Sequence, residues 1–188
     1  MAAARRLWRE QQPGWDARRL VFIDETGLNT KMARLYGRCP TGRRCVSSLP
    51  QGHWQSSTFL AALRHESVGA PFLVDGPVDA DVFTAYLENV LCPELCEGDT
   101  LILDNLSTHK IPSVHRLLSA RGVEVRYLPP YSPDLNPIEL AFAKLKAHLR
   151  QASARTLEDL MAAVAAALDT FSAQHCRGFF RHAQYASV

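Results

Sequence analysis

The sequence contains no long hydrophobic run, and this absence argues against a membrane-spanning helix. No window of the 188 residues approaches the roughly 18 consecutive apolar residues that a span requires. No apolar segment follows the basic start MAAARRLWRE, so we expect no secretory signal peptide. Internal repeats and low-complexity tracts are absent as well. The composition, 47% hydrophobic and 21% charged, is that of an ordinary globular domain.

Cysteine is scarce and irregularly spaced, which argues against a disulfide framework and against a zinc site. The chain has five cysteines, an odd number, and their spacings match no zinc signature. Cys92 and Cys96 lie four positions apart, but no further pair accompanies them. We therefore expect reduced thiols in a cytosolic protein.

Excess charge is also lacking: the net charge is only +2, so bulk charge indicates no particular partner. The basic residues are instead clustered in three segments. Clusters of this kind suit a polyanion such as DNA, while a solvated face explains any single cluster equally well. The clusters are Arg5, Arg6, Arg9, Arg18 and Arg19; Lys31, Arg34, Arg38, Arg43 and Arg44; and Lys144, Lys146 and Arg150.

Hydrophobic periodicity predicts a mixed α/β domain. Closely spaced strands in the first half favour an antiparallel meander, and strands alternating with helices in the second half favour parallel pairing. We expect residues 1–19 to form a linker or short helix outside the core, and Glu25-Thr26-Gly27 to turn the chain after the first strand. The predicted strands are 20–23, 57–63, 71–74, 100–103 and 123–128, with a further short one at 46–49; the predicted helices are 79–91, 112–120, 137–151 and 156–171.

Two of these strands end in an aspartate. Asp24 follows the apolar run 20–23, and Asp104 follows the run 101–103. If the two strands pair in parallel, both side chains project at the edge where open α/β sheets place their sites. Taken singly, an aspartate after a strand is more often a turn or cap residue than a functional one.

A third acid, Glu139, falls at the start of a predicted helix, 34 residues beyond Asp104. Asn136 is a good N-cap and Pro137 suits the first helical position, so Glu139 lies in the first turn. A carboxylate at that position can bond back to the cap residue, and this capping role and a functional role are about equally indicated.

Three carboxylates gathered at one edge of a sheet repel one another unless a cation lies between them. Oxygen ligands without histidine or cysteine select a hard ion such as Mg²⁺ or Mn²⁺. Two such ions would activate the attacking oxygen and stabilise the leaving oxygen of a phosphoryl transfer. The acids therefore predict a metal-dependent site for phosphate chemistry.

The segments VFIDETG, LILDNLSTHK and LPPYSPDLNPIE together resemble the catalytic domain of DDE transposases. The resemblance is closest to the mariner-type superfamily and allied bacterial insertion-sequence enzymes; it covers about residues 20–175, and YSPDLNPIE is its most specific part. It implies an RNase H-like fold, a mixed five-stranded sheet flanked by helices, with 1–19 as a linker remnant and 20–188 as the DDE catalytic domain. It also implies that Asp24, Asp104 and Glu139 form a triad binding Mg²⁺ or Mn²⁺, as two ions.

The resemblance further implies a cut-and-paste reaction on DNA. Strands are cleaved at transposon ends, and the freed 3′-hydroxyls attack target DNA, commonly at TA. The implied partners are DNA and either a second copy of the chain or a full-length transposase, in a bacterial cytoplasm at the nucleoid.

Several further positions match the family pattern. Asn105 and His109 fit a D-N-x-x-x-H motif, in which His109 either orients a water or phosphate or caps the next helix. The segment YGRCPTGRR resembles a G-R-x-P-x-G loop that reaches DNA or a partner subunit, and its arginines suit phosphates. The residues predicted to bind DNA are Arg38, Arg43, Arg44, Asn105, His109, Lys144 and Lys146.

One departure from the family leaves the function open. Transposases of this kind carry N-terminal helix-turn-helix modules, and residues 1–19 are too short to supply one. We therefore expect a truncated or split product, or the catalytic half of an enzyme. Three hypotheses follow: an active DDE nuclease, a catalytically silent remnant that binds DNA or a full-length transposase, and a hydrolase of RNA–DNA hybrids on the same fold.

Overall fold

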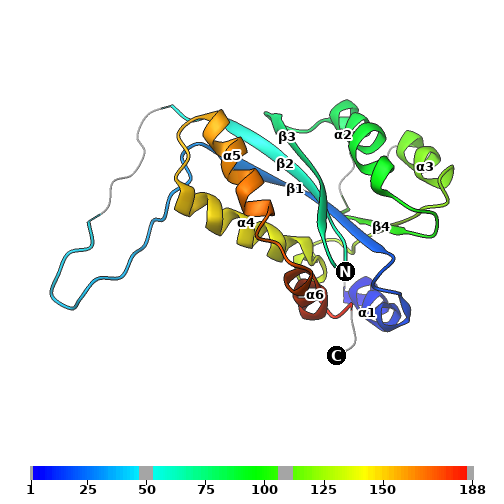
Figure 1. Cartoon of the computed structure of the whole chain (residues 1–188). Helices are drawn as coiled ribbons and strands as arrows, with labels where there is room; N and C mark the ends of the chain where they lie inside the picture. Colours follow the sequence, from blue (N-terminus) through cyan, green and yellow to red (C-terminus); the bar gives the residue numbers. More distant parts are fainter. Residues whose placement is uncertain (1, 47–52, 106–111, 186–188) are drawn as a thin grey trace.

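The computed structural model describes residues 2–46, 53–105 and 112–185. A five-stranded sheet forms its centre, and helices cover both faces (Figure 1). In chain order the elements are α1 (Ala2–Gln11), β1 (Leu20–Asn29), β2 (Ser56–Leu63), β3 (Val68–Asp75), α2 (Ala80–Tyr86) with a π-helical continuation (Leu87–Leu91), β4 (Thr100–Leu103), α3 (Pro112–Ser119), β5 (Glu124–Tyr127), α4 (Ile138–Ala152), α5 (Leu157–Leu168) and α6 (Ala173–His182), with short 3-10 turns at Gln12–Gly14, Cys92–Glu94 and Pro133–Leu135.

The strand order is β3-β2-β1-β4-β5. The pairs β1–β2 and β2–β3 are antiparallel, whereas β1–β4 and β4–β5 are parallel. This confirms the predicted mixed sheet, antiparallel in the first three strands and parallel in the later ones.

Alternation of side chains along the strands divides the core into two clusters. On one face of β1, Leu20, Phe22 and Leu28 pack with residues of α1, α4, α5 and α6. On the other face, Val21 and Ile23 pack with residues of α2 and α3. An even-numbered residue of β1 therefore faces α4, and this parity decides the orientation of Asp24.

The first strand is longer than predicted. It continues to Asn29, and the whole stretch from Phe22 to Asn29 pairs with β2. The expected turn at Glu25-Thr26-Gly27 is wrong. The reason lies in the partner strands: β4 pairs with β1 only as far as Phe22, so the second half of β1 has one open edge, where polar residues and Gly27 remain compatible with a strand.

The expectation that residues 1–19 lie outside the core is also wrong. The indole of Trp8 is only 8% exposed and belongs to the α4-side cluster, and Trp15 packs against it with ring centroids 4.9 Å apart. A single buried tryptophan among arginines does not raise the average hydropathy of a segment, which is why composition alone favoured a linker.

The remaining element predictions are largely confirmed. Asp79 caps α2 and Thr156 caps α5, as expected. The last predicted helix corresponds to α5, which ends at Leu168 rather than at 171, and a further helix that was not predicted, α6, begins after its cap Ser172. The strand predicted at 46–49 lies mostly outside the described residues, and Val46 itself is exposed and irregular. None of the helices in the described parts of the chain has the length and apolarity that a bilayer span demands.

Candidate active site

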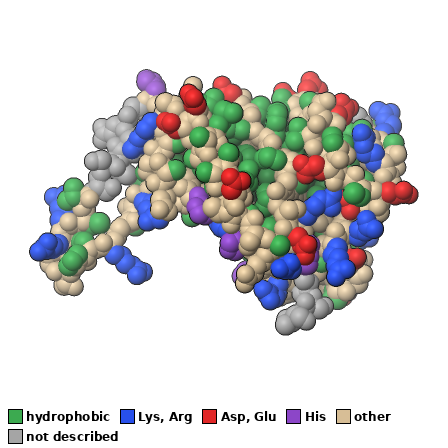
Figure 2. Space-filling view, in the orientation of Figure 1, with side chains coloured by type: hydrophobic (Ala, Val, Ile, Leu, Met, Phe, Trp, Pro, Cys, Tyr) green, Lys and Arg blue, Asp and Glu red, His purple; other side chains and the backbone are tan. Residues whose placement is uncertain are grey.

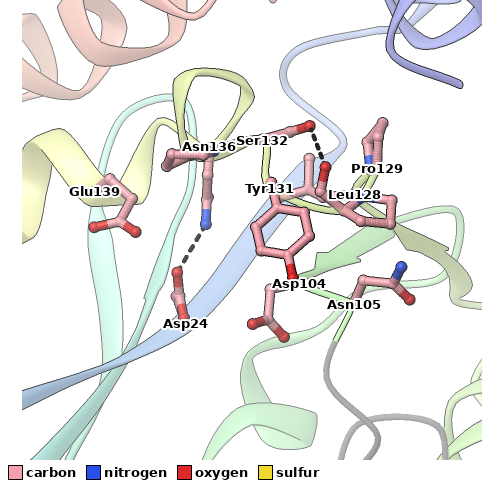
Figure 3. Close-up of a pocket in the computed structure, with 11 residues that line it drawn as sticks. Asp24, Asp104, Asn105, Leu128, Pro129, Tyr131, Ser132, Asn136 and Glu139 are labelled. Atoms are coloured by element: carbon pink, nitrogen blue, oxygen red, sulfur yellow. Dashed lines mark hydrogen bonds between the residues drawn. The ribbon is translucent and has the colours of Figure 1, made fainter. Parts of the chain in front are cut away.

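An open pocket of about 450 Å³ lies where β4 ends and α4 begins, and the three acids singled out from the sequence all line it (Figure 3). Asp24 comes from β1, Asp104 follows β4 directly, and Glu139 lies in the first turn of α4. The rest of the wall consists of Asn105, Asn136 and the segment Leu128, Pro129, Pro130, Tyr131, Ser132 and Pro133.

The register of the sheet explains why the two aspartates meet. The parallel pairing of β1 with β4 aligns Leu20 with Thr100 and Phe22 with Ile102. Continuing that offset by two residues sets Asp24 beside Asp104 on the same face. This is the face covered by α4, so the helix that carries Glu139 packs over the same edge.

Asn136 connects the start of α4 to the sheet. Its Nδ2 donates to Asp24 Oδ2 at 2.8 Å, and the Glu25 N–H donates to Asp24 Oδ1 at 2.7 Å. The carboxylate fixes the orientation of the amide, since the reverse orientation would turn two acceptors toward each other. The side chain is 5% exposed, and its Oδ1 has no hydrogen-bond partner among the described residues.

The predicted capping role of Asn136 is therefore wrong. The helix cap is Pro137, and no side chain accepts a bond there. The Glu139 N–H instead donates to the Asn136 carbonyl at 3.2 Å, and the Glu139 side chain is exposed at the pocket rather than folded back on the cap. The amide of Asn136 is used to hold Asp24.

The donor set of this pocket suits a hard divalent cation, because it offers carboxylate and amide oxygens. In the described part of the chain, no three His, Cys, Asp or Glu side chains lie close enough together to hold one ion. Glu139 is exposed and borders the open pocket, so its side chain has room to rotate.

The loop that forms the upper wall of the pocket in Figure 3 has an unusual backbone. Tyr131 has a φ of 54°, a left-handed conformation that a non-glycine residue seldom adopts, and its side chain is 87% exposed. Ser132 Oγ donates to the Pro130 carbonyl within the same loop. Such strain persists only where surrounding contacts impose it.

The predicted DNA-binding residues do not lie together. Asn105 lines the pocket, whereas His109 lies outside the described residues. Lys144 lies away from the pocket: its Nζ donates to the Thr170 carbonyl at 2.9 Å and contacts His175 Nδ1 at 2.8 Å, and burial lowers its pKa. These contacts give Lys144 a structural role between α4 and the start of α6.

Lys146 lines a second pocket, of about 500 Å³, which we call the basic groove and define by Lys31, Trp54, Lys146 and Arg150. The Lys31 ammonium lies 4.5 Å from the centre of the Trp54 ring. Lys146 and Arg150 follow Glu139 by seven and eleven positions, a spacing that keeps all three on one side of α4.

The arginines of the G-R-x-P-x-G segment lie far from the acids in a long, irregular loop that projects from the body of the protein (Figures 1 and 2). Arg38, Arg43 and Arg44 are all exposed. Three apolar side chains of the same loop are exposed too, Leu35, Tyr36 and Val46.

The fold and the acids that line the pocket define the class of the protein as an RNase H-like α/β domain of the DDE type. The chain belongs to the DDE superfamily endonucleases, because the model of that family matches residues 19–161, about three quarters of the chain. No curated protein sequence matches the chain.

Solved structures of the Mos1 mariner transposase share the fold. The chain superimposes on a pre-cleavage Mos1 transpososome with a TM-score of 0.78 at 16% identity, covering 98% of this chain and 58% of that one. It matches the Mos1 catalytic domain with a TM-score of 0.71 at 15% identity, covering 98% and 86%. A Mos1 paired-end complex with Mg gives 0.67 at 19% identity, covering 97% and 58%. The chain thus spans a little over half of the longer Mos1 chains.

The residue that sequence reasoning missed is Asn136 as a partner of Asp24. Only its position within YSPDLNPIE set it apart, and an asparagine before a proline is first explained as a cap. A second omission is Asp134 of the same motif, which binds arginines of α1. The available signal was the spacing of Arg5, Trp8 and Arg9, one stripe of a helix.

Replacing Asn136 with Asp is expected to lower metal-dependent DNA cleavage about 10- to 100-fold, the usual cost of losing a group that orients a metal ligand. The change removes the donor to Asp24 and sets two carboxylates against each other. The measurement is the nicking rate of supercoiled plasmid at saturating Mg²⁺. Asn89→Asp, the same change at an exposed position, serves as the control; equal rates for Asn136→Asp and Asn89→Asp would contradict the role given to Asn136.

Proposed function

We propose that this chain is the catalytic domain of a DDE transposase, in which residues 20–188 carry the catalytic site and α1 packs against them. It would cleave DNA strands at transposon ends and join the freed 3′-hydroxyls to target DNA. The observation that carries the proposal is the convergence of Asp24, Asp104 and Glu139, from β1, the end of β4 and α4, on one open pocket.

In this proposal the three carboxylates hold Mg²⁺ or Mn²⁺, as a pair of ions. When bound, such ions supply the positive charge that activates the attacking oxygen and stabilises the leaving one. The protein itself positions the carboxylates. Asn136 and the Glu25 N–H bind the two oxygens of Asp24, and the register of the sheet sets Asp104 beside Asp24. The solved Mos1 paired-end complexes with Mg and with Mn support this choice of ions.

The basic groove gives the proposed DNA strand a path away from the acids. Seven and eleven residues of helix place Lys146 and Arg150 about 10 and 16 Å beyond Glu139 along α4. Their charges, with that of Lys31, suit consecutive phosphates and would position the strand without reading its sequence. The half-exposed ring of Trp54 offers a flat face for a base or sugar.

We propose further that the projecting loop contacts either DNA or a second subunit, which is another copy or a full-length transposase. Its arginines suit phosphates, while its exposed Leu35, Tyr36 and Val46 suit a protein surface. Transposon ends, and target DNA at TA, are the substrates that the family resemblance favours. The same resemblance favours a bacterial cytoplasm, with the nucleoid as the place of action.

The test is nicking of a supercoiled plasmid by the chain with Mg²⁺ or Mn²⁺, against a reaction with EDTA. We expect nicked circles only with metal, and cleavage of duplex DNA at least as fast as that of an RNA–DNA hybrid. DNA affinity should also fall steeply between about 50 and 200 mM salt, since the contacts are to phosphates. If the chain binds DNA but does not nick it, the proposal is contradicted and the chain is a silent remnant. If it cleaves the RNA–DNA hybrid faster than duplex DNA, the proposal is contradicted and the chain is a different nuclease.

A further inference from the structure

The helix α1 lies against the loop that leads into α4. Arg5 binds both carboxylate oxygens of Asp134 through its two terminal nitrogens, each at 2.7 Å, and Arg9 reaches Asp134 Oδ2 at 3.0 Å. This fork-to-fork arrangement fixes direction as well as distance. The two arginines lower the pKa of Asp134 to about 2, so the carboxylate is charged throughout the working range of pH.

A second, buried connection runs beside the first. Trp8 Nε1 donates to the Tyr185 hydroxyl at 2.8 Å, and that hydroxyl donates to the Leu135 carbonyl at 2.7 Å. Tyr185 is 3% exposed, and burial raises the pKa of its phenol, so it remains a donor. Gln12 Nε2 holds the chain just before Tyr185 through the Ala183 carbonyl.

The residues that make these contacts, three in α1 and Gln12 directly after it, form one stripe. Arg5, Trp8, Arg9 and Gln12 follow the spacing of three and four residues that places side chains on one side of a helix. Arg6 lies on another side, 79% exposed, and its contact is with Glu10 of the same helix. The helix therefore presents one face to the loop.

The loop held in this way is the wall of the candidate active site. Asp134 itself does not line the pocket, but Pro133 and Asn136 on either side of it do. The carbonyl held by Tyr185 belongs to Leu135, the residue before Asn136. Glu139 follows three residues later, with its N–H bonded to the Asn136 carbonyl.

We infer that α1 positions the active-site loop, and that Arg5, Trp8 and Arg9 are positioning residues for Asn136 and Glu139. One anchor is the ion pair to the Asp134 side chain, and the other is the hydrogen-bonded chain to the Leu135 backbone. The helix thereby fixes the direction in which α4 begins. The catalytic consequence rests on the proposed function; the structural consequence, an ordered loop over 131–140, does not.

The partly exposed ion pair allows the position of the loop to be tested separately from the stability of the fold. The side chains of Arg5 and Asp134 are 29% and 47% exposed, and ion pairs open to solvent contribute little to the free energy of unfolding. Loss of the pair should therefore loosen the loop, which Tyr185 still holds at the Leu135 carbonyl, and leave the fold intact. A misplacement of about 1 Å in a catalytic group costs up to about a hundredfold in rate.

The experiment compares the wild-type chain with Arg5→Gln, Asp134→Asn and the double variant, and with Arg6→Gln as a control of identical chemistry on the same helix. In Arg5→Gln we expect faster deuterium uptake over 131–140, unchanged uptake in β1, and a nicking rate at saturating DNA lowered about tenfold with an unchanged KM. The double variant should be no worse than Asp134→Asn, because that single change already removes the contacts of both Arg5 and Arg9. Arg6→Gln should resemble the wild type.

Unchanged uptake over 131–140 in Arg5→Gln would overturn the inference, and so would an increase spread equally over β1 and α4. If Arg5→Gln takes up deuterium faster over 131–140 but nicks DNA at the wild-type rate, the catalytic part of the inference is overturned. If the wild-type chain does not nick DNA at all, the proposed function fails, while the uptake measurement still decides whether α1 orders the loop.

Discussion

Replacing Asp104 with Asn is expected to lower metal-dependent nicking at least about a thousandfold, the scale of losing a group on which the chemistry depends. The amide keeps the shape of the side chain but removes the negative charge that would hold a divalent ion. Since Asp104 lies beside Asp24 at the end of β4, the loss should be similar for Asp24→Asn, and for Glu139→Gln if that side chain joins them. The measurement is the initial nicking rate of supercoiled plasmid.

A matched control separates this effect from a general loss of charge. Asp75→Asn makes the same change at the end of another strand, β3, where the residue is exposed and away from the pocket. It should nick at the wild-type rate. The Asp104→Asn variant should bind DNA as tightly as the wild type or slightly more tightly, because the change removes a negative charge that repels phosphate. Equal nicking by the wild type and Asp104→Asn would contradict the triad.

Truncating Trp8 to Ala is expected to reduce the free energy of unfolding by about 3 kcal/mol or more, which is typical for a buried aromatic residue. The indole is 8% exposed, packs against Trp15 and donates to Tyr185, so its loss leaves both a cavity and an unpaired hydroxyl acceptor. For a chain of this length the change corresponds to roughly 6–12 °C in melting temperature. Chemical and thermal unfolding followed by circular dichroism measure it.

Leu7→Ala is the control, because Leu7 is the neighbouring residue of α1 and is 54% exposed. Its effect should remain within about 0.5 kcal/mol, as for other surface substitutions. A Trp8→Ala variant as stable as Leu7→Ala would show that residues 1–19 are a linker after all. A large loss would establish α1 as part of the domain.

The sequence alone was sufficient for the strands and helices that carry the acids. The runs 20–23 and 100–103 are apolar enough to be buried strands, and Asn136-Pro137 marks a helix start. These signals are local, because burial of a short run and the start of a helix depend on neighbouring residues. They do not determine which strands pair: the prediction took the parallel pairing of 20–23 with 100–103 as a condition, and the sheet fulfils it.

Only the tertiary structure decided what Asn136, Asp134 and α1 do. Asn136 is 112 positions from Asp24, and Arg5 is 129 positions from Asp134. Locally, each has a simpler explanation: Asn136 as a cap, Asp134 as a turn residue, the arginines as a solvated face. A polar side chain is satisfied by whichever donor or acceptor the fold brings near, and a sequence pattern does not contain that choice.

The same reason limits what the sequence determined about the site. It supplied the acids and the succession of strands along the chain, because hydrophobic burial follows a pattern along the chain. The length of β1 depended on which strand covers each edge, and the shape of the pocket depended on a loop held from α1 and Tyr185. The sequence therefore determined which acidic side chains form the site. Their placement depends on contacts between segments more than a hundred residues apart.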